Sequence, residues 1–437
     1  MSNQGFTRRE FLHSGLAIVS TAGTIPTFLH HSGQVFADAP GTPGARPGVP
    51  EDRILVVIQL SGGNDGLNTV VPFGMDAYYK QRSAIGIDAK QVLTVDKAKG
   101  IGLHPGMGEL YDLLQNGQAS IIQGVGYPNP NRSHFASMDI WHTGDTLDGS
   151  LAGVPKGTGW VGRAMDNLAD RGAADHQNCT ICIGDEAPLA AEGKRVAPIA
   201  FEQANQFRWV GADLHPALGE QYQRMNVQAA EDAAGVGSQA AFVRRTQLDA
   251  QLASDRIRNA VAAGPVTSFP SGRLANQLKM VAAMIRAELP TRVYYVGLGG
   301  FDTHAGQPGR HAQLLTEFSN AVAGFTRELE ALGQKDRVLT MAFSEFGRRV
   351  RQNASAGTDH GTAGPMFLFG PMVRPGLIGE HPSLAKLDDG DLMYHTDFRS
   401  VYAAILDGWL VADSTKVLGR RFQPARVLQS PVPAPGA

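Results

Sequence analysis

Short, continuous apolar runs separated by helical stretches set the strongest constraint on the fold of this chain. The runs are RILVVIQL (53–60), ASIIQGVGY (119–127), RVYYVGLGG (292–300), DRVLTMAF (336–343) and GPMFLFGP (364–371). Strands with one face in water alternate between apolar and polar residues, whereas these runs are predominantly apolar without such alternation, as in strands buried on both faces. They predict an α/β fold with a mostly parallel central sheet and helices on both faces.

Amphipathic patterns occupy the intervals between these runs. Apolar residues recur at helical spacing in 271–289, and further helices are predicted over 311–333 and 395–410. The part from about 145 to 270 is less regular, with short strand fragments followed by a polar stretch rich in Ala and Gln. We therefore predict one α/β domain over 53–430, with a helical insertion at about 145–270 that lies outside the core.

The first 37 residues have the pattern of an export signal. Arg8 and Arg9 precede the apolar stretch GLAIVSTAGTIPTFL, and VFA at 35–37 offers a cleavage position. This resembles a twin-arginine signal peptide. The alternative is a chance pair of arginines before a buried helix. The segment 38–52, rich in Pro and Gly, is predicted to be a linker.

A twin-arginine signal implies transport of the folded chain by the twin-arginine translocase, so we expect a periplasmic or secreted protein. The apolar stretch is short and interrupted by Gly, Thr and Pro, and no stable membrane insertion is expected. Lys and Arg total 39 and Asp and Glu total 41, a balance that argues against a nucleic-acid partner. The sequence leaves the oligomeric state open.

Cys179 and Cys182 form a C-x-x-C pair, which can be redox-active or metal-binding. However, TICIG has the pattern of a strand, which would direct positions three apart to opposite faces. This favours two buried structural cysteines.

Ionisable and hydroxyl side chains follow the predicted strands or precede the last one. In open α/β sheets, ligands bind beyond the carboxyl ends of the strands, so these side chains are candidates for one common site. In chain order they are Asp65, Ser133, Asp302, His304, Glu345, Asp359 and His360.

Carboxylates together with neutral imidazoles suit a divalent metal. Zinc is expected, with Mn, Ca or Mg as alternatives. Ser133 falls at a predicted helix start with Arg132 beside it, as expected for an activated nucleophile or an anion site. A metal, a serine and an anion site together predict transfer or hydrolysis of a phosphoryl or sulfuryl group, with His134 as a candidate leaving-group acid.

Each of these residues also has a simpler structural explanation. Asp65 could be an ordinary turn residue in GGNDG, and Ser133 could be a plain helix N-cap. Glu345 could form an ion pair with Arg348 or Arg349. The metal-site hypothesis therefore depends on the whole set of residues meeting at one edge of the sheet.

Five stretches make the chain similar to a known family: GGNDGLNTVVP, GYPNPNRSHF, GGFDTHAGQ, FSEFGR and GTDHGTAGPMFLFG. They resemble a bacterial, twin-arginine-exported, sulfatase-like family of unknown function within the alkaline phosphatase and sulfatase superfamily. The resemblance spans about 50 to 425, and it implies an alkaline-phosphatase-like α/β fold.

By position, Asp65 resembles the metal-bridging acid that follows the first strand of that superfamily, and Ser133 resembles its nucleophile. Asp302 and His304 resemble the acid and imidazole of one metal site, with His360 as the third ligand.

Three departures from the superfamily pattern bear on activity. The first pair is Asp-x-His where Asp-x-x-x-His is common, and Ser344-Glu345 replaces the Asp-His of a second metal site, for which Asp359 is a possible substitute. The chain has no Cys-x-Pro-x-Arg, which excludes a formylglycine nucleophile.

The function that follows is an exported, metal-dependent hydrolase of a small-molecule phosphate or sulfate ester. The alternative is a non-catalytic, metal-binding relative that acts as a binding or assembly partner of another exported protein. A serine α/β-hydrolase and a metalloprotease are disfavoured, because Gly-x-Ser-x-Gly and His-Glu-x-x-His are absent from the sequence.

Overall fold

A computed structural model describes four stretches of the chain, residues 52–145, 154–170, 179–205 and 253–429. The predicted signal peptide and all of the predicted linker except Asp52 lie outside the described residues.

One mixed sheet of nine strands forms the centre of the domain, in the order β11-β5-β10-β9-β1-β8-β6-β7, with β14 also paired to β5. All pairings are parallel except those of β10, which runs antiparallel to β9 and to β5. This confirms the predicted mostly parallel sheet. The strands are β1 (Ile54–Ser61), β5 (Ala119–Gly126), β6 (Cys179–Ile183), β7 (Ile199–Phe201), β8 (Thr291–Gly299), β9 (Val338–Phe343), β10 (Gly364–Phe369), β11 (Gly376–Ile378) and β14 (Thr396–Asp397).

The strand directions bring the chain to one edge of the sheet several times. Strands β8 and β9 run parallel to β1, and β5 has the same direction because both β5 and β9 are antiparallel to β10. The carboxyl ends of β1, β5, β8 and β9 therefore share an edge. The loop that enters the reversed strand β10 reaches the same edge, so residues from five distant parts of the sequence can meet there.

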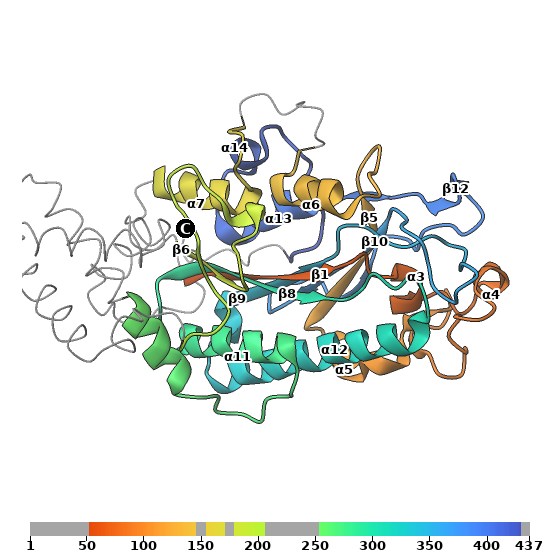
Figure 1. Cartoon of the computed structure of the whole chain (residues 1–437), viewed down its shortest axis with the longest axis horizontal. Coiled ribbons are helices and arrows are strands. Elements are labelled where there is room, and N and C mark those ends of the chain that lie inside the picture. The colour runs from red at the N-terminus through yellow and green to blue at the C-terminus, as the bar shows by residue number, and fades with distance from the viewer. Residues whose placement is uncertain (1–51, 146–153, 171–178, 206–252, 430–437) are drawn as a thin grey trace, which may run out of the picture.

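Helices cover both faces of the sheet, as predicted (Figure 1). One face carries α5, α11 and α12, and the other carries α6, α7, α13 and α14. Their bounds are α5 (Gly108–Gln115), α6 (His134–Thr143), α7 (Trp160–Asp170), α11 (Arg273–Arg286), α12 (Gln307–Ala331), α13 (Phe398–Ile405) and α14 (Ser414–Leu418).

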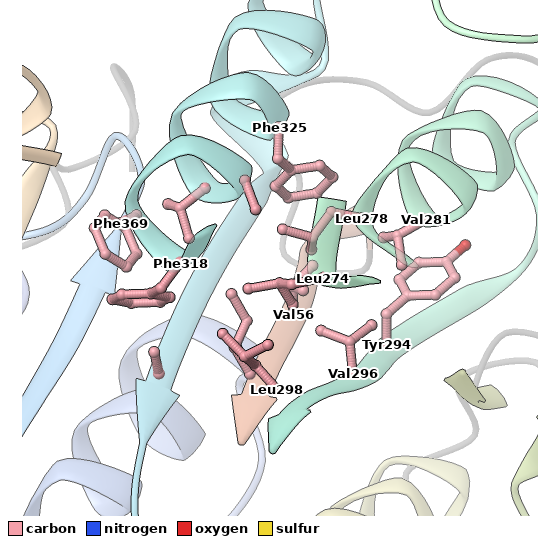
Figure 2. Packing of buried hydrophobic residues seen from close by; sticks show 14 of the residues in the cluster. Val56, Leu274, Leu278, Val281, Tyr294, Val296, Leu298, Phe318, Phe325 and Phe369 are labelled. Atoms are coloured by element: carbon pink, nitrogen blue, oxygen red, sulfur yellow. The ribbon is translucent and has the colours of Figure 1, made fainter. Parts of the chain in front are cut away.

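Strand β1 shows why apolar residues occupy consecutive positions. Val56 and Ile58 belong to the core layer below α11 and α12, while Leu55 and Val57 belong to the layer below α6, α7 and α13. Figure 2 shows the first layer, in which Val56 lies among side chains from the neighbouring strands and helices. Burial of each such side chain contributes about 1.5–3 kcal/mol, and this packing fixes the sheet edge that carries the polar loops.

The stretch 145–270 differs from the expected insertion. Strands β6 and β7 extend the central sheet beyond β8, and α7 packs in the second core layer. Part of this stretch therefore belongs to the core, because β6 pairs with both β8 and β7 in the central sheet. A helix over 253–262 is also described, whereas 206–252 lies outside the described residues.

Smaller elements complete the fold near the site. Helices α3 (Gly66–Thr69) and α4 (Asp76–Gln81) follow β1, and a three-stranded sheet joins β2 (Val70–Val71), β4 (Ile101–Leu103) and β3 (Leu93–Asp96). The hairpin β12 (Leu387–Asp388) and β13 (Asp391–Leu392) precedes β14. Within the four described stretches, no helix is both long and apolar enough to cross a membrane.

Candidate metal centre

Three imidazoles and one carboxylate converge at the shared edge of the sheet. Asp302 and His304 follow β8, His360 precedes β10, and His134 is the first residue of α6. The His304 Nε2 atom lies 3.0 Å from Asp302 Oδ1 and 2.9 Å from His360 Nε2. His360 Nε2 is 3.2 Å from Asp302 Oδ1, and His134 Nε2 is 3.5 Å from Asp302 Oδ2. The structure thus brings together Asp302, His304 and His360, and it adds His134.

The opposite nitrogen of each imidazole is held by an oxygen atom. His134 Nδ1 lies 2.8 Å from Glu345 Oε1, and His304 Nδ1 lies 3.1 Å from Asp359 Oδ1. His360 Nδ1 lies 2.8 Å from the backbone carbonyl oxygen of Arg132. A carbonyl or carboxylate oxygen only accepts, so each Nδ1 carries the proton and donates. In the neutral tautomer, each Nε2 then presents its lone pair to the centre of the cluster.

This arrangement of lone pairs fits a bound cation. His134 Nε2 is buried and has no hydrogen-bond partner among the described residues. Two Nε2 lone pairs that face each other at 2.9 Å repel unless a positive charge lies near both. Ligand atoms around a tetrahedral zinc ion lie roughly 3.3 Å apart, which follows from bonds of about 2.0–2.1 Å. The observed separations of 2.9–3.5 Å are close to that value.

Two glycines allow the loops to approach closely enough to form the cluster. Gly62, which follows β1, has φ +116°, and a Cβ there would lie 2.4 Å from the backbone nitrogen of Asp302. A Cβ on Gly357 would lie 2.2 Å from the carbonyl carbon of His304. Any larger residue at either position would push apart two of the loops that carry site residues.

The buried guanidinium of Arg348 orients Asp302. It donates to Asp302 Oδ1 at 2.6 Å and to the carbonyl oxygens of Phe301, Thr358 and Gly63 at 3.1, 2.9 and 2.7 Å. Partial burial raises the pKa of Asp302, but the hydrogen bond and charge of Arg348 outweigh it and lower the pKa to about 2. The carboxylate is therefore ionised at neutral pH, as a metal ligand must be.

Glu345 acts on the cluster through His134. Its side chain is 1% exposed, and Oε1 also accepts a hydrogen bond from the backbone N–H of Gly62 at 2.8 Å. Burial raises the pKa of Glu345, but the His134 hydrogen bond and the other donors bring it below the usual value. The same hydrogen bond raises the pKa of His134. Ser137 Oγ donates to the Glu345 carbonyl oxygen at 2.6 Å, which fixes the start of α6.

Asp359 has the same relation to His304. Its carboxylate accepts from Asn353 Nδ2 at 3.2 Å, and this hydrogen bond is the main reason that its pKa lies below the usual value. Asn353 Nδ2 also donates to the His304 carbonyl oxygen at 2.8 Å. Glu345 and Asp359 are therefore placed to orient imidazole ligands from behind, an arrangement that is common around zinc.

In the sequence, Ser133 lies between His134, which belongs to the cluster, and Arg132, whose backbone carbonyl oxygen accepts a hydrogen bond from His360. It occupies the N-cap position of α6, yet its side chain accepts no hydrogen bond from the helix. The residue is exposed, and its hydroxyl has no hydrogen bond to any described residue. The Ser133 hydroxyl therefore does not act as a hydrogen-bonding helix cap. The Arg132 guanidinium, in contrast, is already paired with Asp389 and Asp391.

Asp65 does not join the four converging side chains, which differs from the expectation for the first strand's acid. Its carboxylate is fully buried, 2.5 Å from Arg82 Nη1, and it also accepts from Gln307 Nε2. Burial raises the pKa of Asp65, but the Arg82 charge and hydrogen bond produce a net lowering. The guanidinium thus supplies the positive charge that a metal would otherwise give this carboxylate.

The sequence does not predict that Arg348 orients a metal ligand, and it suggests His134 only as a leaving-group acid. Arg348 is a possible ion-pair partner of Glu345 by sequence, but in the structure it pairs with Asp302. The one available signal for His134 was its place in NRSHF, directly after the candidate nucleophile at a helix start.

Comparisons of the whole fold find solved structures that are similar to this chain at low identity. A protein in the alkaline phosphatase superfamily from Vibrio parahaemolyticus is 11% identical, with TM-score 0.38 over 96% of this chain and 78% of that chain. The PsFucS1 sulfatase from Pseudoalteromonas sp. is 12% identical, with TM-score 0.40 over 86% and 72%. The lipoteichoic acid synthase LtaP from Listeria monocytogenes is 10% identical, with TM-score 0.33 over 79% and 72%.

These similarities transfer neither an activity nor a ligand set to this chain, because identities and TM-scores are both low. No curated protein is significantly similar in sequence. One sequence family matches over residues 52–406, which is more than half of the chain and includes every residue of the converging cluster. The chain therefore belongs to the family described as protein of unknown function (DUF1501).

Proposed function

We propose that this protein is an exported, metal-dependent hydrolase of a phosphate or sulfate ester. The observation that carries the proposal is the unpartnered Nε2 of His134, which faces the carboxylate of Asp302 and the imidazole of His360. A buried nitrogen without a hydrogen bond is costly, and a bound metal ion would satisfy it.

Asp302, His304, His360 and His134 are the residues that would hold the ion. Three imidazoles and one carboxylate favour zinc, with Mn, Ca or Mg as weaker fits because these ions prefer more oxygen ligands. The side chains of the three histidines are 24–44% exposed, so the centre is open to a small molecule from solvent. His134 is better suited to this role than to that of leaving-group acid, because its Nδ1 proton is held by Glu345.

Ser133 is the proposed nucleophile. Its free hydroxyl and its place between His134 and the Arg132 carbonyl support this role. Its Oγ would form a bond to phosphorus or sulfur as the bond to the alcohol oxygen breaks, and its proton would pass through solvent to the departing alcohol oxygen. Water would then release the anion and restore Ser133. The bound ion would supply Lewis-acid charge that lowers the pKa of nearby oxygen groups and stabilises negative charge in the transition state.

An ester panel tests the proposal. Wild type, Ser133→Ala, His360→Ala and chelated protein would be assayed against aryl and alkyl phosphates and sulfates. Ser133→Ala should lose turnover while keeping its metal, and His360→Ala should lose both. Wild-type turnover no higher than that of Ser133→Ala on every ester would refute the hydrolase.

A non-catalytic, metal-binding partner of another exported protein is the second candidate. The observation in its favour is the Asp65–Arg82 pair, because it removes the acid that would bridge to a second metal. Metal bound at the same four residues without ester turnover would support this alternative.

Export completes the proposal. Arg8 and Arg9 would direct the folded chain through the twin-arginine translocase to the periplasm or the medium, with no stable membrane insertion. The substrate would be a small-molecule ester met there.

A further inference from the structure

A partly enclosed cavity of about 120 Å³ lies next to the candidate metal centre. It lies between the loop that leaves β5 and the loop that follows β13. Most of its wall is aromatic or aliphatic, from Tyr127, Trp141, Phe346, Leu392, Met393 and Tyr394.

The size and lining of the cavity match one compact apolar group. An apolar cavity of about 150 Å³ is known to accept benzene, whereas a drug-sized ligand needs at least about 300 Å³. Met393 and Tyr394 are 40% and 39% exposed at this cavity, although both are large apolar side chains. Their exposure is explained if a ligand covers them.

Trp141 is a fixed aromatic part of the cavity wall. It is 2% exposed, and its ring stacks on Phe343 and Phe398. Solvent does not reach its indole nitrogen, so Trp141 contributes apolar ring surface to the cavity.

The cavity shares two wall residues with the metal centre. The Phe346 ring lies 4.9 Å, between ring centroids, from both His134 and His360, and Glu345 holds His134. A molecule in the cavity is thus one side-chain layer from the ligands. An ester whose anionic group reaches the metal can place its alcohol portion here, past the short loop that carries Ser133.

We infer that this cavity binds the aryl or other compact apolar alcohol portion of the ester substrate. The inference rests on the proposed function for the identity of the ligand. The binding step itself requires no turnover.

Phenol binding to chelated protein, followed by ¹⁹F NMR with 4-fluorophenol, tests the site without any activity. Met393→Lys should weaken binding at least tenfold, because it places a charge at the apolar wall. Val266→Lys is the control, since Val266 is an exposed apolar residue (57%, against 40% for Met393) that does not line the cavity. No saturable binding, or equal binding by Met393→Lys and Val266→Lys, would overturn the inference.

Ester kinetics then tests the assignment to the substrate. Met393→Lys should raise the KM of an aryl ester relative to the KM of a small polar ester, such as glycerol phosphate. An equal change for both esters would refute the assignment. If no ester is turned over, the proposed function fails, and the phenol titration still decides whether the cavity is a binding site.

Discussion

Asp65→Asn distinguishes most sharply between a metal ligand and a buried structural acid. The substitution replaces a fully buried carboxylate with a neutral amide and leaves the Arg82 guanidinium, also fully buried, without its counter-ion. Removing one partner of a buried pair costs about 3–5 kcal/mol. Arg82 keeps its hydrogen bonds to the Val350 and Arg349 carbonyl oxygens and to Asn68 Oδ1, so we expect the lower end, about 3 kcal/mol.

That loss would appear as a lower midpoint in urea unfolding and a melting temperature lower by roughly 6 °C, at about 2 °C per kcal/mol for a large domain. Bound zinc per chain should stay at the wild-type level. Arg82→Met combined with Asp65→Asn should be less damaging than the sum of the single changes, because the pair is removed together. Loss of metal with unchanged unfolding free energy would show that Asp65 is a ligand and that the structural explanation is wrong.

Three further predictions follow from the site and from the N-terminus. Glu345→Gln should weaken zinc binding about 10–100-fold, measured by competition with a chelating dye, because His134 loses its orienting carboxylate; unchanged affinity would contradict this role. In chelated protein, Asp302 has a folded pKa of about 2, below its unfolded value, so it stabilises the fold above about pH 4 and loses this contribution as the pH falls towards 2. Urea unfolding at several pH values should show a smaller acid dependence for Asp302→Asn than for wild type, and identical profiles would refute the assignment. Replacement of Arg8 and Arg9 by Lys should leave folded precursor in the cytoplasm, and mature periplasmic protein at the wild-type level would disprove the signal.

The central sheet, and the edge where the candidate site lies, could be predicted because strands buried on both faces have runs of apolar residues in the sequence. Strands β1, β5, β8, β9 and β10 all coincide with continuous apolar runs. The polar residues that follow or precede such runs then meet by strand direction alone. For this reason, Asp302, His304 and His360 could be grouped across 58 positions (302 to 360).

Side-chain partners within that edge could not be read from the sequence, because they depend on distances of a few ångströms. Asp65 follows a strand, as a metal ligand of this fold would, but its carboxylate forms an ion pair with Arg82, which directly follows α4. Arg348 and Arg349 are adjacent and identical in type, so the sequence does not distinguish their partners. In the structure, Arg348 is buried against Asp302, whereas Arg349 pairs with the exposed Asp389.

The place of β6 and β7, in the stretch 145–270, could not be predicted for a different reason. Strands β6 and β7 have only five and three residues, too short for periodicity to separate a core strand from a loop fragment. Their place in the sheet is set by pairing with β8, a contact far away in sequence.

The most direct test of the metal centre is the metal content of mature protein purified from its own export pathway, measured by mass spectrometry. We predict about one zinc ion per chain in wild type and in Asp65→Asn, and almost none in His360→Ala. Wild-type protein that binds no divalent metal after zinc loading, or His360→Ala that binds as much as wild type, would contradict the assignment of Asp302, His304, His360 and His134 as ligands.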